Sequence, residues 1–286
     1  MNSRPMIRRR VVTSRWRLSD HALWLILAAL AASWAVPLLW AVVTSLRPPG
    51  EAVSVGSWLG TGFSLANYRR AWGYAPFGTY YLNTILIVTG ILSSQLVTIT
   101  LAGFAFARMQ FRGKDFLFMI FLLQLMVPAE ALVVPNYITI RALNLVDTRT
   151  AIILPYVGSA FGTFLLRQTF KQVPRELEEA AAIDGCGPLR TLWHVFLPAA
   201  RPTLVAFGLV SVSYHWNNFF WPLIVTNSPQ VRPLTVGLAL FAKAVEAGAD
   251  WSLVTAATVI VILPLFAAFL VFQRQFVSSF LRSGMK

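Results

Sequence analysis

The stretch that decides the fold runs from Tyr80 to Phe106 and reads YYLNTILIVTGILSSQLVTITLAGFAF. It contains 27 residues, and none of them is Asp, Glu, Lys or Arg. A helix that crosses the hydrocarbon core of a bilayer needs about 20 consecutive, mostly apolar residues. The stretch is therefore long enough to span a membrane, and it predicts a membrane protein.

The composition of the whole chain supports this interpretation. Of its 286 residues, 57% are hydrophobic and 12% are charged, whereas an ordinary soluble domain has about 25% charged residues. These values argue against a water-soluble enzyme and exclude a disordered chain, since disordered chains are rich in charge and poor in aromatic residues. The single cysteine, Cys186, excludes a disulfide framework and a four-cysteine metal site.

Six apolar runs along the chain are candidates for spanning helices. The fourth reaches spanning length only if Phe170 or the preceding residues 147–150 extend it. Gly, Pro, Ser and Thr recur within the runs, as they do in membrane helices whose neighbours satisfy freed backbone groups. We therefore predict an all-α integral membrane protein with six transmembrane helices. The runs are roughly Ala22–Leu46, Tyr80–Phe106, Phe116–Val134, Ala151–Leu166, Thr203–Val225 and Trp251–Phe272.

The basic residues predict which side of the membrane each loop faces. Of the 24 Lys and Arg residues, 17 lie in the N-terminal tail, in two alternate loops and in the C-terminal segment. Cytoplasmic loops retain an excess of Lys and Arg, so we expect both termini in the cytoplasm, as an even number of spans also requires. The net charge of +13 is then a property of these loops, and no nucleic-acid partner is expected.

The predicted organisation is a short cytoplasmic tail, residues 1–20, followed by a membrane domain, residues 21–286, with its core at about 79–272. A cleaved signal peptide is the alternative for the N-terminus. The apolar part of a signal peptide has about 7–15 residues, and the first run here is longer. The first run is therefore expected to stay as a membrane span.

Sequence signatures of an enzyme are scarce. The three histidines, His21, His194 and His215, are scattered, and no pair has the spacing of metal ligands. The chain has no G-x-x-x-x-G-K-[ST] motif that would hold ATP phosphates and no G-x-S-x-G motif. We therefore expect no catalytic residue, no metal and no cofactor in this chain, so its energy source is a gradient or another subunit.

One hydrophilic segment, residues 171–202, has the pattern of two short helices joined at a glycine. Gly185 suits a left-handed position after the first helix, and Pro188 suits the first turn of the second, which we expect to end before Pro198. The run Ala180–Ala182 leaves a nearly bare face that another protein can approach closely. An amphipathic loop lying on lipid is the alternative, but surface helices are usually rich in Lys and Arg rather than in acids.

The same segment resembles the EAA loop of ABC importer permeases, whose pattern is E-A-A-x₃-G-x₉-I-x-L-P. Val195 in place of Ile is the only departure from the pattern. In that family the loop is a pair of coupling helices that inserts into a cleft of the ATP-binding subunit. The residues that match this coupling motif are Glu179, Ala180, Ala181, Gly185, Leu197 and Pro198.

This resemblance implies a type I ABC importer permease fold in the bacterial cytoplasmic membrane. It also implies a set of partners: a second permease subunit, two ATP-binding subunits that hold ATP and Mg²⁺, an extracytoplasmic solute-binding protein, and membrane lipid. One six-helix chain forms only half of a translocation path, and its own sequence has no ATP site. A heteromeric assembly is therefore expected.

Further motifs resemble the carbohydrate-uptake permeases of the maltose-transporter type. Phe164–Gln168 and Trp216–Pro222 are similar, within that group, to the glycerol-3-phosphate permeases. The resemblance implies a sugar, an oligosaccharide, glycerol-3-phosphate or a glycerophosphodiester as substrate. A phosphate group calls for Arg, Lys or a helix N-terminus, and no Arg or Lys lies in the middle of any run. The other motifs are Asn67-Tyr68, Leu82-Asn83-Thr84, Ala102 to Arg108, Leu145 to Thr148 and Gln273 to Val277.

The fifth run supplies the polar side chains that we expect along the substrate path. If the run is one helix, four of them share a face: Tyr214, Asn217, Asn218 and Trp221. Amide and indole groups suit a polyol, because amides both donate and accept hydrogen bonds. The alternative is that these groups bond between helices or form an interfacial aromatic belt. Gln95, in the second run, is expected to take part in interhelical packing.

A stand-alone six-helix secondary carrier or channel is the alternative function. Such a protein has no need of an acidic, alanine-rich elbow, and it often has internal repeats or ion-binding acids at membrane depth. A membrane-embedded enzyme, a third possibility, requires clustered His or acidic residues at that depth. The sequence contains neither pattern. It therefore favours the transmembrane permease subunit of an ATP-binding-cassette importer, which is not itself an enzyme.

Overall fold

The computed structural model describes residues 17–51, 60–246 and 250–284, and these ranges contain helices and no β-strand. Most of the predicted N-terminal tail lies outside the described residues. The helices are α1 (Arg17–Ser45), α2 (Ala66–Tyr74), α3 (Phe77–Arg108), α4 (Lys114–Leu123), η1 (Gln124–Met126), η2 (Ala129–Leu132), α5 (Val133–Ala142), α6 (Arg149–Ile153), η3 (Leu154–Tyr156), α7 (Ala160–Gln172), α8 (Arg175–Ile183), α9 (Pro188–Thr191), η4 (Leu192–Phe196), α10 (Leu197–Trp216), α11 (Phe220–Val225), α12 (Leu234–Glu246) and α13 (Trp251–Gly284).

Four helical segments are long and apolar enough to cross a membrane. They are His21–Ser45, Phe77–Arg108, Pro188–Trp216 and Trp251–Val271. They confirm the first, second and sixth predicted spans and place the fifth earlier in the chain than the sequence suggested. The all-α membrane fold class is therefore confirmed within the described residues.

The third and fourth predicted spans are broken rather than straight. Lys114–Met126 and Ala129–Ala142 meet at 102°, and Arg149–Tyr156 and Ala160–Gln172 meet at 43°. The first break lies at Pro128, because proline has no N–H to donate and disfavours a helical residue before it; Val127 is extended. The described part of the chain therefore has six candidate spans only if each bent pair counts as one.

The prediction of one continuous helix over Thr203–Val225 is wrong. The backbone of Asn217 caps α10, and α11 begins after a turn at Phe220. The other end also differs, because the second helix of the hydrophilic segment does not end before Pro198. It continues through η4, a π-helical segment, into α10. The wider turn of a π segment accommodates the ring of a proline that follows it.

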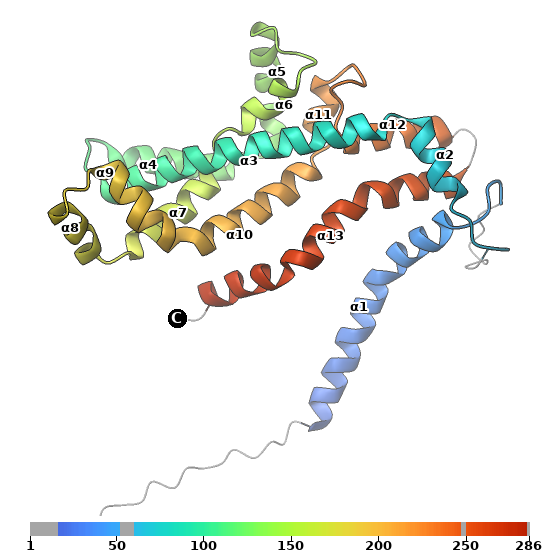
Figure 1. Cartoon of the computed structure of the whole chain (residues 1–286), viewed down its shortest axis with the longest axis horizontal. Helices are drawn as coiled ribbons and strands as arrows, with labels where there is room; N and C mark the ends of the chain where they lie inside the picture. The colour runs from blue at the N-terminus through green and yellow to red at the C-terminus, as the bar shows by residue number, and fades with distance from the viewer. Residues whose placement is uncertain (1–16, 52–59, 247–249, 285–286) are drawn as a thin grey trace, which may run out of the picture.

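Helix α3 is the central helix of the molecule and runs along most of its length (Figure 1). Three buried clusters each include residues of α3: one with α2, α12 and α13, one with α5, α6 and α11, and one with α7, η4 and α10. Gly103 allows the close approach of α7, since a Cβ there would lie 2.9 Å from the Cβ of Leu166. The α8–α9 elbow lies at one end of α3, and α2 and α12 lie at the other (Figure 1).

Helix α1 projects away from this body and packs against α13 near one end (Figure 1). The most apolar 18-residue part of α1 is not buried at all within the chain. Large side chains such as Trp24, Leu25 and Trp34 are more than two thirds exposed. So large an apolar surface must be covered by lipid or by another subunit.

Candidate functional site

The elbow between α8 and α9 has the geometry that its glycine predicts. Gly185 has a φ of +76°, which confirms the predicted left-handed position. The N–H of Cys186 donates to the carbonyl of Ala181 at 2.9 Å, and the N–H of Gly185 donates to that of Ala182 at 3.0 Å. This pair of bonds is the Schellman motif that ends many helices. The two helices therefore meet at a defined angle.

The two faces of α8 differ in what they contact. Glu178 and Ala181, three residues apart on one face, lie toward the body of the protein, and Ala181 is only 8% exposed. Glu179 and Ala180 are exposed on the other side. The coupling motif is therefore divided: its first glutamate and one alanine are free to meet another protein, while the second alanine holds α8 in place.

The elbow segment also carries large apolar side chains that are exposed. Ile183 is 87% exposed. Isolated apolar residues are common on protein surfaces, but a group of them on a hydrophilic segment is typical of a contact site. These residues were not among the predicted site residues, although a tryptophan in so polar a segment is a usable signal of a contact site. The exposed group consists of Leu177, Ile183, Leu189 and Trp193.

Leu197 and Pro198 lie away from the tip of the elbow, at the start of α10. Leu197 packs against the buried cluster of Phe104, Phe170 and Phe196. The last two residues of the motif therefore join the elbow to a membrane-spanning helix. The helical segment Pro188–Trp216 is continuous, so no loop separates the elbow from the spanning helix.

Two of the four predicted path residues line one groove. Tyr214 and Asn217 lie at the edge of a cavity of about 690 Å³ between α10, α12 and α13, with Trp216 beside them. Tyr214 is about half exposed. The amide nitrogen of Asn217 donates to the backbone carbonyl of Ser213 at 2.8 Å, so the oxygen of that amide is left for another partner. The remaining walls of the groove are mainly apolar.

The other two predicted path residues lie elsewhere, so the prediction that all four share one face is wrong. Trp221 is 3% exposed, and its indole N–H donates to the carbonyl of Ala151 at 3.2 Å. Asn218 donates to the hydroxyl of Tyr156 at 2.9 Å. The break after Trp216 explains this separation, because residues beyond it no longer follow the rotation of α10.

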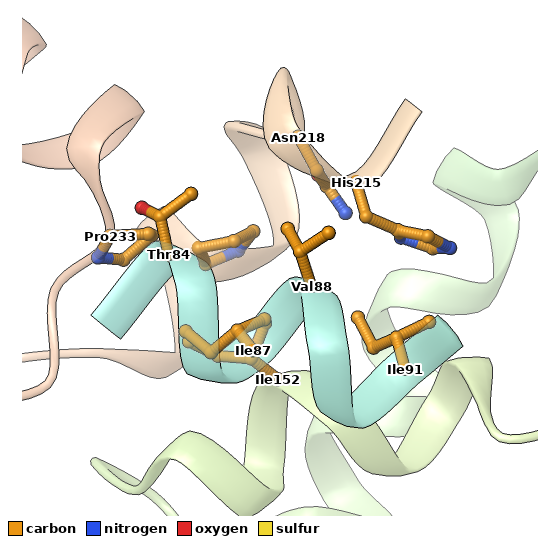
Figure 2. A pocket seen from close by; sticks show the side chains of 9 residues that line it. Thr84, Ile87, Val88, Ile91, Ile152, His215, Asn218 and Pro233 are labelled. Atoms are coloured by element: carbon orange, nitrogen blue, oxygen red, sulfur yellow. The ribbon is translucent and has the colours of Figure 1, made fainter. Parts of the chain in front are cut away.

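A buried polar network links α3 to α10 beside Asn218. Ser211 donates to the side-chain oxygen of Gln95 at 2.6 Å, and the amide nitrogen of Gln95 lies 3.4 Å from Nε2 of His215. This confirms that Gln95 takes part in interhelical packing. His215 and Asn218 face Thr84 and Val88 of α3 across a small cavity of about 10 Å³ (Figure 2).

The end of α3 opposite the elbow is fastened by side-chain hydrogen bonds. Asn83 is fully buried and donates to the carbonyls of Gln230 and Arg232, both at 2.9 Å. Nε of Arg149 donates to the side-chain oxygen of Asn83 at 2.8 Å. The loop between α11 and α12 is thereby fixed against α3 and α6.

Asp147 fastens the same loop from the other side. Its carboxylate accepts the backbone N–H groups of Asn227 and Ser228 at 2.7 and 2.9 Å. Partial burial alone would raise the pKa of Asp147, but these two donors and nearby Arg232 outweigh it, so the pKa lies below its ordinary value. The motifs Leu82-Asn83-Thr84 and Leu145 to Thr148 therefore meet at one loop.

Comparison with known proteins identifies this architecture. The family described as "Binding-protein-dependent transport system inner membrane component" matches residues 99–282. The chain belongs to this family. It is therefore a multi-pass inner-membrane component and the permease subunit of a transport system. The matched residues include the whole α8–α9 elbow.

Relatives of this permease are similar over most of its length. It is 31% identical to the diacetylchitobiose uptake system permease protein NgcG of Streptomyces coelicolor, over 93% of this chain and 87% of that protein. It is 32% identical to the arabinooligosaccharides transport system permease protein AraQ of Halalkalibacterium halodurans, over 87% and 90%. It is also 32% identical to the sn-glycerol-3-phosphate transport system permease protein UgpE of Yersinia enterocolitica, over 71% and 72%.

Solved structures agree with the sequence relatives. The permease matches a chain of a bacterial ABC transporter involved in the import of the acidic polysaccharide alginate, with a TM-score of 0.82 and 25% identity. The match covers 92% of this permease and 98% of that chain. It shares its fold, with a TM-score of 0.62, with a chain of the bacterial alginate transporter in complex with an alginate pentasaccharide-bound periplasmic protein. The chain therefore has the fold of an ABC importer permease.

Proposed function

We propose that this permease imports a carbohydrate-type solute, driven by ATP that a separate subunit hydrolyses after docking on the α8–α9 elbow. The observation that carries the proposal is the elbow itself. Glu179 and Ala180 are exposed on it, exposed apolar side chains lie on the same segment, and the elbow is joined through η4 to the spanning helix α10. An exposed, rigid projection with both charged and apolar groups is typical of a protein-binding site.

The elbow lies in the cytoplasm in this proposal, and the loop held by Asn83 lies outside. The two sites are at opposite ends of α3 (Figure 1), so one spanning helix separates them. Of the 24 basic residues, 17 lie in the tail, loops and segment that this orientation puts in the cytoplasm, which supports the proposal that both termini are cytoplasmic. The chain then contributes no catalytic residue, and ATP with Mg²⁺ binds to its partners.

The bare surface of α1 and the groove beside Asn217 support a second permease subunit as a partner. The groove has walls from α10, α12 and α13, and an opposing subunit would close it into a path. Two ATP-binding subunits and an extracytoplasmic solute-binding protein complete the assembly. A related importer structure contains a substrate-bound periplasmic protein, which supports the last of these partners.

A neutral sugar or oligosaccharide suits the groove best. Its polar groups are hydroxyls, an indole and the amide of Asn217, and among the residues that the structure describes no Arg, Lys, Asp or Glu lines it. Such groups suit the alternating hydroxyl and C–H surfaces of a carbohydrate. A glycerol-3-phosphate substrate would need a positive charge from the second permease subunit.

Asn217→Ala tests whether the groove is the substrate path. Loss of one buried hydrogen bond to the substrate should lower the efficiency of uptake by about tenfold, while assembly and basal ATP hydrolysis stay normal. Asn227→Ala, which alters an exposed amide at the outer loop, serves as the control. Unchanged uptake by Asn217→Ala would leave Asn217 with a structural role and remove the groove from the path.

Reconstitution separates the proposal from the alternative of a stand-alone carrier. The permease is placed in vesicles with and without its partner subunits, and uptake of radiolabelled oligosaccharides is measured with ATP or with an imposed ion gradient. The proposal predicts uptake only with all partners and ATP. Uptake by the permease alone, driven by a gradient, would contradict it.

Labelling with an impermeant thiol reagent tests the orientation. The native Cys186 in the elbow should stay unlabelled in intact cells and react after the membrane is opened. Asn227→Cys, combined with Cys186→Ser, should react in intact cells. The reverse pattern would place the elbow outside and remove the docking proposal.

A further inference from the structure

Arg108, the last residue of α3, contacts three other parts of the chain at the base of the elbow. Its side chain is 9% exposed. Nη2 donates to the carbonyl of Phe170 at 2.8 Å and also to that of Val173. Nη1 lies 3.4 Å from Oε2 of Glu178 on α8. The guanidinium also lies 5.1 Å from the centre of the Phe196 ring in η4.

These contacts match the needs of each partner. The last carbonyls of a helix have no partner within it, and a positive charge near them is favourable; Phe170 lies in the last turn of α7. Glu178 is the acidic residue on the inner face of α8, and Phe196 presents the face of its ring to a cation. The five N–H donors of one guanidinium can reach more of these groups together than the three donors of a lysine.

The chain between α7 and α8 consists only of Val173 and Pro174. Val173 is buried with Phe104 and Phe170 in the cluster at the base of the elbow. Helix α8 therefore cannot move far without changing the contacts of Arg108. Because Arg108 is the last residue of α3, such a movement of α8 acts directly on α3.

We propose that Arg108 is the positioning residue that fixes the α8 elbow to the end of α3 and transmits movement of the elbow to the membrane-spanning body. This inference rests on the proposed function, in which the elbow docks on an ATP-binding subunit. Arg108 is not one of the residues of the coupling motif, because it lies on α3, which is not part of the elbow. Its partner Glu178 faces away from the exposed Glu179.

Arg167 provides a matched control. It too is a nearly buried arginine at this end of the molecule, with its Nε donating to the carbonyl of Phe106 at 3.1 Å. Its guanidinium lies 3.8 Å from the centre of the Phe118 ring on α4. It therefore joins α7 to α3 and α4 without contacting α8. Loss of Arg167 should disturb packing while leaving the elbow in place.

The experiment uses the complete transporter in vesicles, with spin labels at the native Cys186 and at Leu101→Cys on α3. The distance distribution between the labels reports the position of the elbow, and the number of substrate molecules imported per ATP hydrolysed reports coupling. Arg108→Met should broaden the distribution and lower the import per ATP by about tenfold, the order expected for lost hydrogen bonds to a charged group. Arg108→Lys should recover part of both, and Arg167→Met should change neither.

Two further variants keep the test decisive if Arg108→Met does not assemble. Glu178→Gln leaves the hydrogen bonds from Arg108 to the end of α7 in place and should broaden the distribution to a smaller extent. Arg108→Lys should behave in the same way. The inference would be overturned if Arg108→Met and Arg167→Met changed the distance distribution and the import per ATP equally. It would also be overturned if the distance stayed unchanged in all Arg108 and Glu178 variants. Absence of ATP-driven uptake in the unaltered transporter would instead contradict the proposed function.

Discussion

Each end of α3 is held by hydrogen bonds from a side chain to backbone carbonyls, but the two ends differ in the role that we propose for them. At one end, Asn83 and Arg149 bond to the loop between α11 and α12, and Asp147 holds the loop from the other side. At the other end, Arg108 bonds to the end of α7 and to α8. In both places an arginine joins helices that are distant in sequence.

The difference lies in what remains exposed. At one end, the side chains of Asn83, Arg149 and Asp147 bond to partners within the chain. The elbow end satisfies Arg108 in the same way but leaves Glu179 and Ile183 exposed to solvent. The contacts at the first end hold segments of one chain together, and the second end also carries the exposed side chains on which we propose that the ATP-binding subunit docks. Changes at the first end should therefore reduce stability, and changes at the second should reduce coupling.

Asn83→Ala should have the largest effect on stability. It removes two hydrogen bonds to the carbonyls of Gln230 and Arg232 and takes away the acceptor of Nε of Arg149. The expected loss is about 2–4 kcal/mol, since each lost bond costs about 1 kcal/mol and unpaired polar groups add to it. Thermal unfolding in detergent measures it. Asn227→Ala is the control, and equal stability of the two variants would contradict the difference between the ends.

Gly185→Ala should have an intermediate effect at the elbow. No atom lies within 4 Å of a Cβ built at Gly185, so the cost comes from its left-handed backbone alone, about 1–2 kcal/mol. Gly187→Ala is the matched control, since Gly187 also has open space but a φ of −72°. Uptake and substrate-stimulated ATP hydrolysis should fall in the first variant only. Equal activity of the two variants would show that the angle of the elbow does not matter.

Asp147→Asn should have the smallest effect, no more than about 1 kcal/mol, because a partly exposed carboxylate is screened by water. The pKa of Asp147 lies below its ordinary value of 3.8. Its contribution is therefore fully present above about pH 4 and is lost as the pH falls through the lowered value. Unfolding temperatures from pH 3 to pH 7 should converge for the two proteins at the acidic end. A difference that grows as the pH falls would contradict this assignment.

The apolar runs and the glycine elbow were predictable from the sequence because each depends on local properties. An uncharged run of spanning length indicates a membrane helix whatever surrounds it, and Gly185 suits a left-handed position that other residues avoid. These parts of the structure agree with the sequence analysis.

The path residues were harder to predict because their positions depend on where α10 ends. Nothing in Trp216–Phe220 forbids a helix, and the turn there is held by tertiary bonds, including those from Asn218 to Tyr156 and from Thr235 to the carbonyl of Asn218. The role of Arg108 was hidden for the same reason, since its partners lie more than 60 residues away. Such contacts become visible only once the helices are packed.

The most direct test of the account compares Glu179→Ala with Glu176→Ala in the reconstituted transporter. Both glutamates are exposed on α8, but only Glu179 belongs to the coupling motif. Loss of one member of a charge pair that is buried in a complex costs about 2–5 kcal/mol, whereas an exposed charge near a helix start contributes less than about 1 kcal/mol. Uptake and substrate-stimulated ATP hydrolysis should collapse in Glu179→Ala and stay near normal in Glu176→Ala. Normal transport by Glu179→Ala at normal expression would contradict the claim that this elbow couples the permease to ATP hydrolysis.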